Sequence, residues 1–139
     1  MRALLDTSIL IAAEPSPEVE AAISVASIAE LHFGVLVATD DDERALRINR
    51  LGAIESTFDP LPVTVTVARE WGRLAAAVNN RGGQPRRRAT DLAIAATANV
   101  HGVPLLTLNV ADFRLIGDLT DVRHPSDVQP GDSEPGPGD

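Results

Sequence analysis

Four acidic side chains of this chain lie where an apolar segment meets a turn or the start of a helix. Asp6 and Asp112 each follow a strand-like apolar run. Glu30 and Asp91 fall in the first turns of two predicted helices. In a parallel α/β sheet the carboxyl ends of strands and the adjacent helix starts share one edge, where ligands bind. Carboxylates gathered there would repel one another by about 4 kcal/mol per close pair at an effective dielectric near 20. A hard divalent cation is the simplest group that would hold them together.

Each acid also has an ordinary structural interpretation when it is taken alone. Asp6 could be a polar stop on a strand, and Asp112 could cap a short helix. Glu30 stands three residues after Ser27, which matches a capping box. The negative charge of Asp91 could interact favourably with the positive end of the macrodipole at a helix N-terminus. The combination favours a functional site, because all four acids map to one edge of one predicted sheet.

The elements that must position these acids alternate between strands and helices. The predicted strands cover residues 2–5, 23–25, 63–65 and 103–108, with one more near residue 122. The predicted helices cover or begin at residues 7–13, 18–22, 27, 40, 66 and 91–100. This alternation predicts an α/β domain with a mainly parallel sheet over residues 1–124. Pro, Gly, Ser and Asp dominate residues 125–139, so we expect a disordered tail there.

Composition excludes several classes of chemistry. The 139 residues, 44% of them apolar, suffice for one hydrophobic core. The chain has no cysteine, which excludes disulfides and thiolate chemistry. All 12 basic residues are arginine, so mechanisms that need a lysine are excluded as well. No run approaches the length of a membrane span, and no signal peptide is recognisable, so we expect a cytoplasmic protein without a membrane partner.

The formal charge of −8 argues at first against a nucleic-acid partner. Its distribution weakens that objection, because residues 118–139 hold six acids and one arginine. The other 117 residues carry 14 acids and 11 arginines, a net charge of −3, and four of those acids belong to the predicted site. Apart from its site, the body of the protein is therefore close to neutral.

Four short motifs around these acids resemble, in family order, those of PIN-domain nucleases. They are residues 4–11 (LLDTSILI), 25–31 (VASIAEL), 89–96 (ATDLAIAA) and 106–113 (LTLNVADF). The small size of the chain is most similar to that of VapC-type toxins from bacterial toxin–antitoxin pairs. The segment between the first two acids is short for the family.

The resemblance implies a PIN-like three-layer α/β fold, with a mainly parallel central sheet flanked by helices. It implies a toxin endoribonuclease that depends on Mg²⁺ or Mn²⁺, is inhibited by a cognate VapB-type antitoxin and forms a homodimer. A divalent cation held by carboxylates can activate water and neutralise phosphate without a catalytic histidine or lysine.

The residues suggest how the roles divide. We expect Asp6 and Asp91 to be the principal metal ligands, directly or through water. Glu30 and Asp112 would complete the catalytic and metal site by holding a second ion or orienting the attacking water. Supporting hydrogen bonds are expected from nearby polar side chains, namely Thr7, Ser8, Thr107 and Asn109.

The arginines just ahead of Asp91 are candidates for RNA contact. Arg86, Arg87 and Arg88 could bind the phosphate backbone. A solvated basic loop, or a clamp for an acidic segment of an antitoxin, explains them equally well.

Two other classes of protein remain as alternatives. A phosphatase-like hydrolase that uses Asp6 would need a second aspartate at the position of Ser8, and a lysine. A non-catalytic metal-binding or protein-binding α/β module fits the same residues, because a sequence cannot show turnover.

Overall fold

A computed structural model of the chain describes residues 1–12 and 19–128. In chain order its elements, with η for a 3-10 helix, are β1 (Arg2–Leu5), α1 (Thr7–Ala12), β2 (Glu20–Ala22), α2 (Val25–Val37), α3 (Asp41–Thr57), α4 (Val65–Asn80), η1 (Pro85–Arg88), α5 (Ala89–His101), β3 (Leu105–Leu106), η2 (Val110–Ile116), β4 (Val122–Arg123) and η3 (Pro125–Asp127).

The strands form one sheet in the order β2-β1-β3-β4, and all three pairings are parallel. Leu4 pairs with Leu105 across β1 and β3, and Leu105 pairs with Val122 across β3 and β4. The predicted parallel α/β fold and the strand near residue 122 are therefore confirmed. The chain goes from β1 outward to β2 and later returns to β3 on the other side of β1. Strand order thus reverses between β1 and β3, the place where α/β sheets bind ligands.

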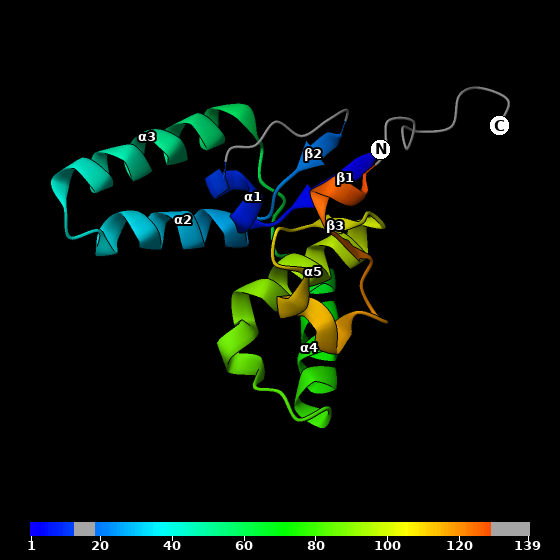
Figure 1. Cartoon of the computed structure of the whole chain (residues 1–139). Helices are drawn as coiled ribbons and strands as arrows, with labels where there is room; N and C mark the ends of the chain where they lie inside the picture. The colour runs from blue at the N-terminus through cyan, green and yellow to red at the C-terminus, as the bar shows by residue number, and fades with distance from the viewer. Residues whose placement is uncertain (13–18, 129–139) are drawn as a thin grey trace, which may run out of the picture.

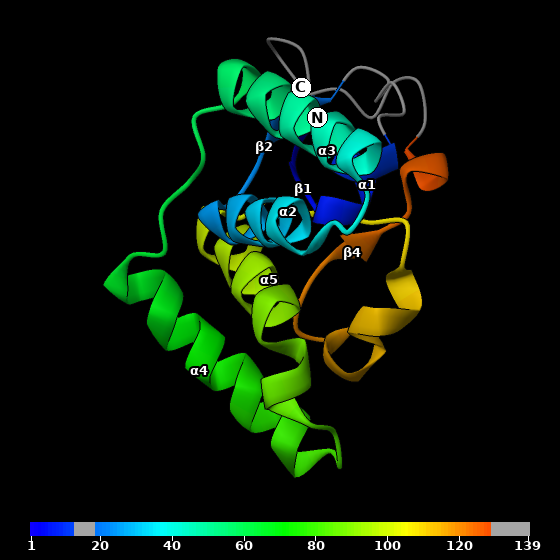
Figure 2. The same ribbon diagram turned by 90° about the vertical axis from the view of Figure 1, so that its left-hand side faces the viewer.

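Helices lie on both sides of the sheet (Figures 1 and 2). Successive side chains of a strand point to opposite faces, so each central strand contributes to both sides. Leu4 and Leu105 belong to a buried cluster with residues of α4 and α5. Leu5 and Leu106 belong to a second cluster with residues of α1, α2 and α3. Burying each of these leucines contributes about 1.5–3 kcal/mol. The two cores make the sheet the middle of three layers, as the PIN-like fold requires.

Helix α5 carries one of the predicted acids at its start and is buried along most of its length. Residues 92–98 are all buried, because α5 packs between α4 and the sheet. Gly102 ends the helix with a φ of 66°, a left-handed conformation that glycine adopts without a steric penalty. This rigid anchoring fixes the position of the helix start at the site.

The predicted start of α2 was wrong by three residues. Ser24 is the N-cap, and its hydroxyl accepts a hydrogen bond from the amide of Ala26. Ser27 lies inside the first turn and is buried, so it does not form the predicted capping box with Glu30. Residues 20–22, predicted as part of a helix, form β2, and the predicted strand at 23–25 is instead the link into α2.

Two other local predictions also failed. Residues 63–65 form no strand: Thr64 caps α4 by accepting a hydrogen bond from the Val67 amide. Leu61 alone bridges to Ser24 beside the sheet. Thr90 does not cap α5, because η1 runs directly into that helix and Arg88 occupies the N-cap position without a side-chain cap.

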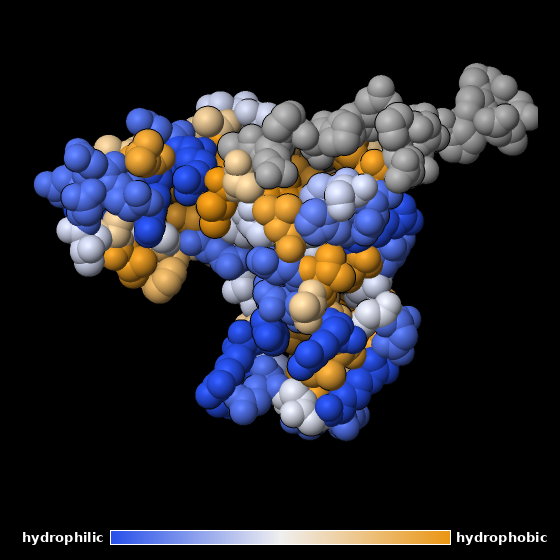
Figure 3. Space-filling model, viewed as in Figure 1, coloured by the Kyte–Doolittle hydropathy of each residue, from blue (hydrophilic) through white to orange (hydrophobic). Residues whose placement is uncertain are grey.

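Helices α2 and α3 pack against each other and extend from the body of the molecule as an arm (Figure 1). The arm exposes large apolar side chains, and Figure 3 shows hydrophobic surface along its α2 side. These side chains are Phe33, Leu36, Val37, Leu46 and Ile48. Large exposed apolar patches mark contact surfaces for other molecules.

The C-terminal region begins as ordered structure. Pro125–Asp127 form η3, and Val128 packs against the second core cluster. The rest of the predicted tail, residues 129–139, lies outside the described residues. Within the described part of the chain, no helix is long and apolar enough to cross a membrane.

Candidate active site

Asp6 lies buried directly after β1, and its carboxylate receives three hydrogen bonds on one oxygen. The hydroxyls of Ser8 and Thr107 donate to Oδ2 over 2.7 and 2.9 Å, and the Ser8 amide donates over 3.4 Å. Oδ1 has no hydrogen-bond donor among the described residues. A buried carboxylate is costly unless its charge is compensated. The arrangement fixes one oxygen and leaves the other open to a ligand.

The parallel pairing of β1 with β3 brings Thr107 to Asp6. The Asp6 amide donates to the Leu106 carbonyl over 2.9 Å, so the two strand ends are in register. The Ser8 hydroxyl accepts from the Leu108 amide over 3.1 Å, which directs its single proton toward Asp6. The predicted supporting positions Ser8 and Thr107 thus lie against the first acid.

Glu30 lies in α2 with its side chain turned toward the start of α1. The Thr7 hydroxyl donates to Glu30 Oε1 over 2.7 Å, and it lies 2.9 Å from the hydroxyl of buried Ser27. Burial raises the pKa of Glu30, the Thr7 hydrogen bond lowers it, and the negative charge of Asp6 raises it. The net direction is upward, so Glu30 is in a partly desolvated and negatively charged environment.

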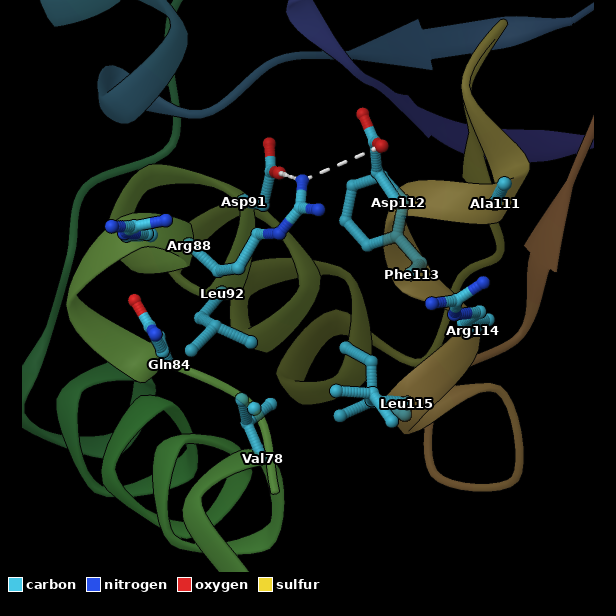
Figure 4. Close-up of a pocket in the computed structure, with 13 residues that line it drawn as sticks. Val78, Gln84, Arg88, Asp91, Leu92, Ala111, Asp112, Phe113, Arg114 and Leu115 are labelled. Carbon is cyan, nitrogen blue, oxygen red and sulfur yellow. Dashed lines mark ion pairs between the residues drawn. The ribbon is translucent and has the colours of Figure 1, made fainter. Parts of the chain in front are cut away.

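Asp91 and Asp112 come from α5 and η2 and share one arginine. Arg88 Nη1 lies 3.7 Å from Asp91 Oδ2 and 3.4 Å from Asp112 Oδ1. Figure 4 shows the guanidinium reaching up between the two carboxylates. Asp112 is 44% exposed and Asp91 is 25% exposed at the side chain. Asp112 is therefore open to solvent, Asp91 is largely buried, and both pair with Arg88.

The electrostatics of Asp91 place all four acids in one neighbourhood. The pKa of Asp91 is raised to about 6, chiefly by burial and then by the negative charges of Asp6, Glu30 and Asp112. The positive charge of Arg88 acts in the opposite direction but is outweighed. A carboxylate destabilised by three neighbouring anions is a common property of cation-binding and catalytic sites. The structure thus brings the four predicted acids together at the carboxyl edge of the sheet.

The chemistry of these residues fits a hard divalent cation. All the candidate donors are carboxylate oxygens, the ligands that Mg²⁺ and similar ions prefer. A guanidinium already pairs with two of them, so a positive charge is stable at this point. Across residues 1–12 and 19–128, however, no three acidic or histidine side chains stand close enough to ligate one ion directly. Bound water or a side-chain movement is needed to complete a coordination shell.

A pocket of about 370 Å³ opens beside Asp91 and Asp112 (Figure 4). Its polar lining includes Gln84, Arg87 and Arg114, and its floor is apolar. Gly83 closes one wall against η2: a Cβ there would lie 2.6 Å from Leu115 Cδ1 and 2.7 Å from a Val78 methyl. Only glycine allows this close approach.

The other predicted residues, two arginines and an asparagine, lie beside the four acids or close to them in the sequence. Arg86 and Arg87 are exposed on η1, and Arg87 lines the pocket. The backbone amide of Asn109 donates to the Thr107 hydroxyl over 3.0 Å, while the carboxamide side chain of Asn109 makes no hydrogen bond within the described chain. Sequence reasoning missed the buried hydroxyl of Ser27 and the double pairing of Arg88. The three-residue spacing from Arg88 to Asp91 was a signal for half of that pairing.

Comparison with known proteins agrees with this fold. The PIN domain family model matches residues 3–118. Ribonuclease VapC5 of Mycobacterium tuberculosis (strain ATCC 25618 / H37Rv) is 36% identical over 111 residues, which span 75% of this chain and 80% of that protein. Ribonuclease VapC8 of Mycobacterium tuberculosis (strain CDC 1551 / Oshkosh) is 39% identical over 103 residues, spanning 70% and 90% of the two chains.

A solved structure extends the similarity to three dimensions. The crystal structure of VapBC-5 from Mycobacterium tuberculosis, a member of the VapBC family of toxin–antitoxin systems, aligns with a TM-score of 0.75 at 33% identity. The alignment covers 88% of this chain and 96% of that one. The chain therefore belongs to the PIN-domain family, and within it to the VapC group. PIN-domain ribonucleases in general depend on divalent metal ions.

Proposed function

We propose that this chain is a toxin endoribonuclease that hydrolyses RNA phosphodiester bonds with Mg²⁺ or Mn²⁺ held at four carboxylates. The single observation that carries the proposal is the convergence of these acids: Arg88 lies within 3.7 Å of both Asp91 and Asp112, and the charges of the other three acids add to burial in raising the pKa of Asp91. Ribonuclease names among the relatives support the activity. The four carboxylates are Asp6, Glu30, Asp91 and Asp112.

Asp6 and Asp91 are the principal ligands in this proposal. Asp6 offers Oδ1, while Ser8 and Thr107 hold its other oxygen and fix the orientation of the carboxylate. Glu30, oriented by Thr7, accepts a proton from the attacking water or holds it in line. The bound cation supplies charge neutralisation for the phosphate and activation of that water. Exposed Asp112 completes the site through water.

The exposed arginines next to the site support an RNA substrate. Arg86 and Arg87 lie on η1, and Arg87 and Arg114 line the adjoining pocket. Arginine binds phosphate oxygens in a bidentate manner, which provides backbone affinity without sequence readout. We propose that the chain acts on RNA in the cytoplasm.

The test is cleavage of a mixed RNA substrate by the purified chain with Mg²⁺ or Mn²⁺. We expect the wild type to cleave, and Asp6→Asn and Asp91→Asn to lose activity. The matched control is Glu55→Gln, an exposed acid on α3 that should leave cleavage unchanged. Equal cleavage by the wild type and both site variants would reject the assignment. If no protein cleaves while all of them fold, a non-catalytic binding module becomes the better reading.

We also propose that a VapB-type antitoxin inhibits the chain and that the chain forms a homodimer. The apolar side chains exposed on the α2–α3 arm support protein partners. Co-expression with a small DNA-binding protein encoded by a neighbouring gene should relieve toxicity, and the chain and that protein should purify together. Lack of toxicity when the chain is expressed alone at high level would remove the toxin part and leave the nuclease part standing.

A further inference from the structure

The feature that the proposed chemistry does not use is the position of Arg88 between two of its own site carboxylates. The guanidinium of Arg88, at the end of η1, lies 3.4 Å from Asp112 of η2 and 3.7 Å from Asp91 of α5. A divalent cation bound between these two acids would lie where the Arg88 guanidinium now supplies the positive charge. Arg88 and a divalent ion therefore compete for one place.

The contacts of Arg88 are those of a displaceable group. Both distances exceed the length of about 2.7–2.9 Å of a strong charge-assisted hydrogen bond, and neither contact is a hydrogen bond. The Arg88 side chain is 45% exposed, so it can leave without disturbing the core. By contrast, Arg81 makes a bidentate contact with Asp118 at 2.6 and 3.1 Å and also donates to the Leu115 carbonyl. Arg81 therefore has a structural role, whereas the longer contacts of Arg88 do not hold the fold together.

The surroundings give a displaced Arg88 somewhere to go. It already lines the pocket beside the acids, together with Arg87, Arg114 and Gln84. This lining carries the donors that bind a phosphate oxygen. A guanidinium released from the carboxylates would stay within this positively charged wall, next to the place where the scissile phosphate must lie.

We propose that Arg88 is an exchangeable counter-ion: it neutralises Asp91 and Asp112 until a divalent cation takes over these carboxylates, and it then binds the RNA phosphate. The inference rests on the proposed metal site. In the described chain Arg88 supplies the positive charge between two of the four acids. The inference gives Arg88 a role that differs from that of Arg86 and Arg87.

The test measures the affinity of the full chain for Mn²⁺ in the absence of RNA. Mn²⁺ is titrated into the protein, and binding is followed by calorimetry or by the electron paramagnetic resonance signal of free Mn²⁺. Arg88→Met, which keeps the length but not the charge, should bind Mn²⁺ roughly three- to tenfold more tightly than the wild type. Arg86→Met removes a neighbouring charge without an ion pair to the site, and it should change affinity little. Arg88→Lys should lie between the two.

A second measurement separates exchange from a structural role. At saturating Mn²⁺, Arg88→Met should raise the KM for RNA several-fold, because the phosphate contact is lost. Opposite signs, tighter metal and weaker RNA, are the signature of exchange, whereas a disrupted fold would weaken both. If the wild type binds Mn²⁺ and cleaves RNA but Arg88→Met binds Mn²⁺ no more tightly, only this inference is overturned. If neither protein binds Mn²⁺ or cleaves, the proposed function fails and the inference falls with it.

Discussion

The two halves of the site are built in different ways. Asp6 and Glu30 are held by neutral hydroxyls at 2.7–2.9 Å, in a setting fixed by the β1–β3 pairing. Asp91 and Asp112 instead share one arginine, at 3.7 and 3.4 Å, and Asp112 is exposed to solvent. The first half is rigid before any ligand arrives, and the second half can rearrange. A rigid half positions the cation, and an adaptable half lets substrate and cation enter together.

The largest expected effect distinguishes the halves directly. Asp6→Asn should lower RNA cleavage by more than about 100-fold, since loss of a supporting residue alone typically costs about 10–100-fold. Asp112→Asn should lower it by only about tenfold, because this exposed acid acts through water in our proposal. Single-turnover cleavage at saturating Mn²⁺ measures both. Equal losses in the two variants would contradict the division.

The second effect tests the rigidity of the Asp6 half. Thr107→Val removes a buried hydroxyl that donates to Asp6 and keeps the side-chain volume. We expect a loss of about 10–100-fold in cation affinity and about 1–3 kcal/mol in the free energy of unfolding. Urea denaturation and Mn²⁺ titration measure the two quantities. Thr57→Val, at an exposed helix position, is the matched control and should leave cation affinity unchanged.

The third effect concerns the pH dependence of the adaptable half. The pKa of Asp91 is raised from 3.8 to about 6, so between about pH 4 and pH 6 the folded chain binds more protons there than the unfolded chain does. The free energy of unfolding should therefore fall as the pH rises through that window.

Asp91→Asn should remove this slope. It should stabilise the metal-free chain by about 1–3 kcal/mol above pH 6, with no gain near pH 4. Urea denaturation at several pH values measures this, with Glu55→Gln as the control. A variant that is no more stable than the wild type at neutral pH would show that Asp91 is not strained by its neighbours.

The smallest effect concerns the exposed arginines. Arg86→Ala should weaken RNA binding by a few-fold and reduce the dependence of log affinity on log salt by about one unit. Arg50, on the α3 arm, provides the control, and Arg50→Ala should leave the salt dependence unchanged. Fluorescence anisotropy with a short single-stranded RNA measures both. If Arg86→Ala leaves the salt dependence of RNA affinity unchanged, Arg86 does not contact the RNA backbone.

The layout of the fold was predictable where burial dominated. The apolar runs of β1 and β3, and the buried stripe of α4, gave the parallel α/β class and the edge on which the acids lie. One local error arose where a residue of the proposed site also matched a structural pattern. Glu30 matched a capping box with Ser27, but both side chains bond to Thr7 in the site instead. Functional sites are where local rules are expected to fail.

Other features needed the three-dimensional structure. The β-branched run at residues 63–65 favours a strand, yet it leads into α4 because the Thr64 hydroxyl caps that helix. The pairing of Arg88 with Asp112 joins positions 24 residues apart in sequence, and no local pattern could reveal it. The sequence therefore indicated the four acids of the proposed site. It did not indicate that Arg88 lies between Asp91 and Asp112.

Gly83 provides a route to tune this molecule without altering any charged group. A Cβ at that position would lie 2.6 Å from the tip of the Leu115 side chain in η2 and 2.7 Å from a Val78 methyl in α4, so an alanine would force a local shift beside the segment that carries Asp112. We expect Gly83→Ala to lower cleavage partially, with every charged side chain retained.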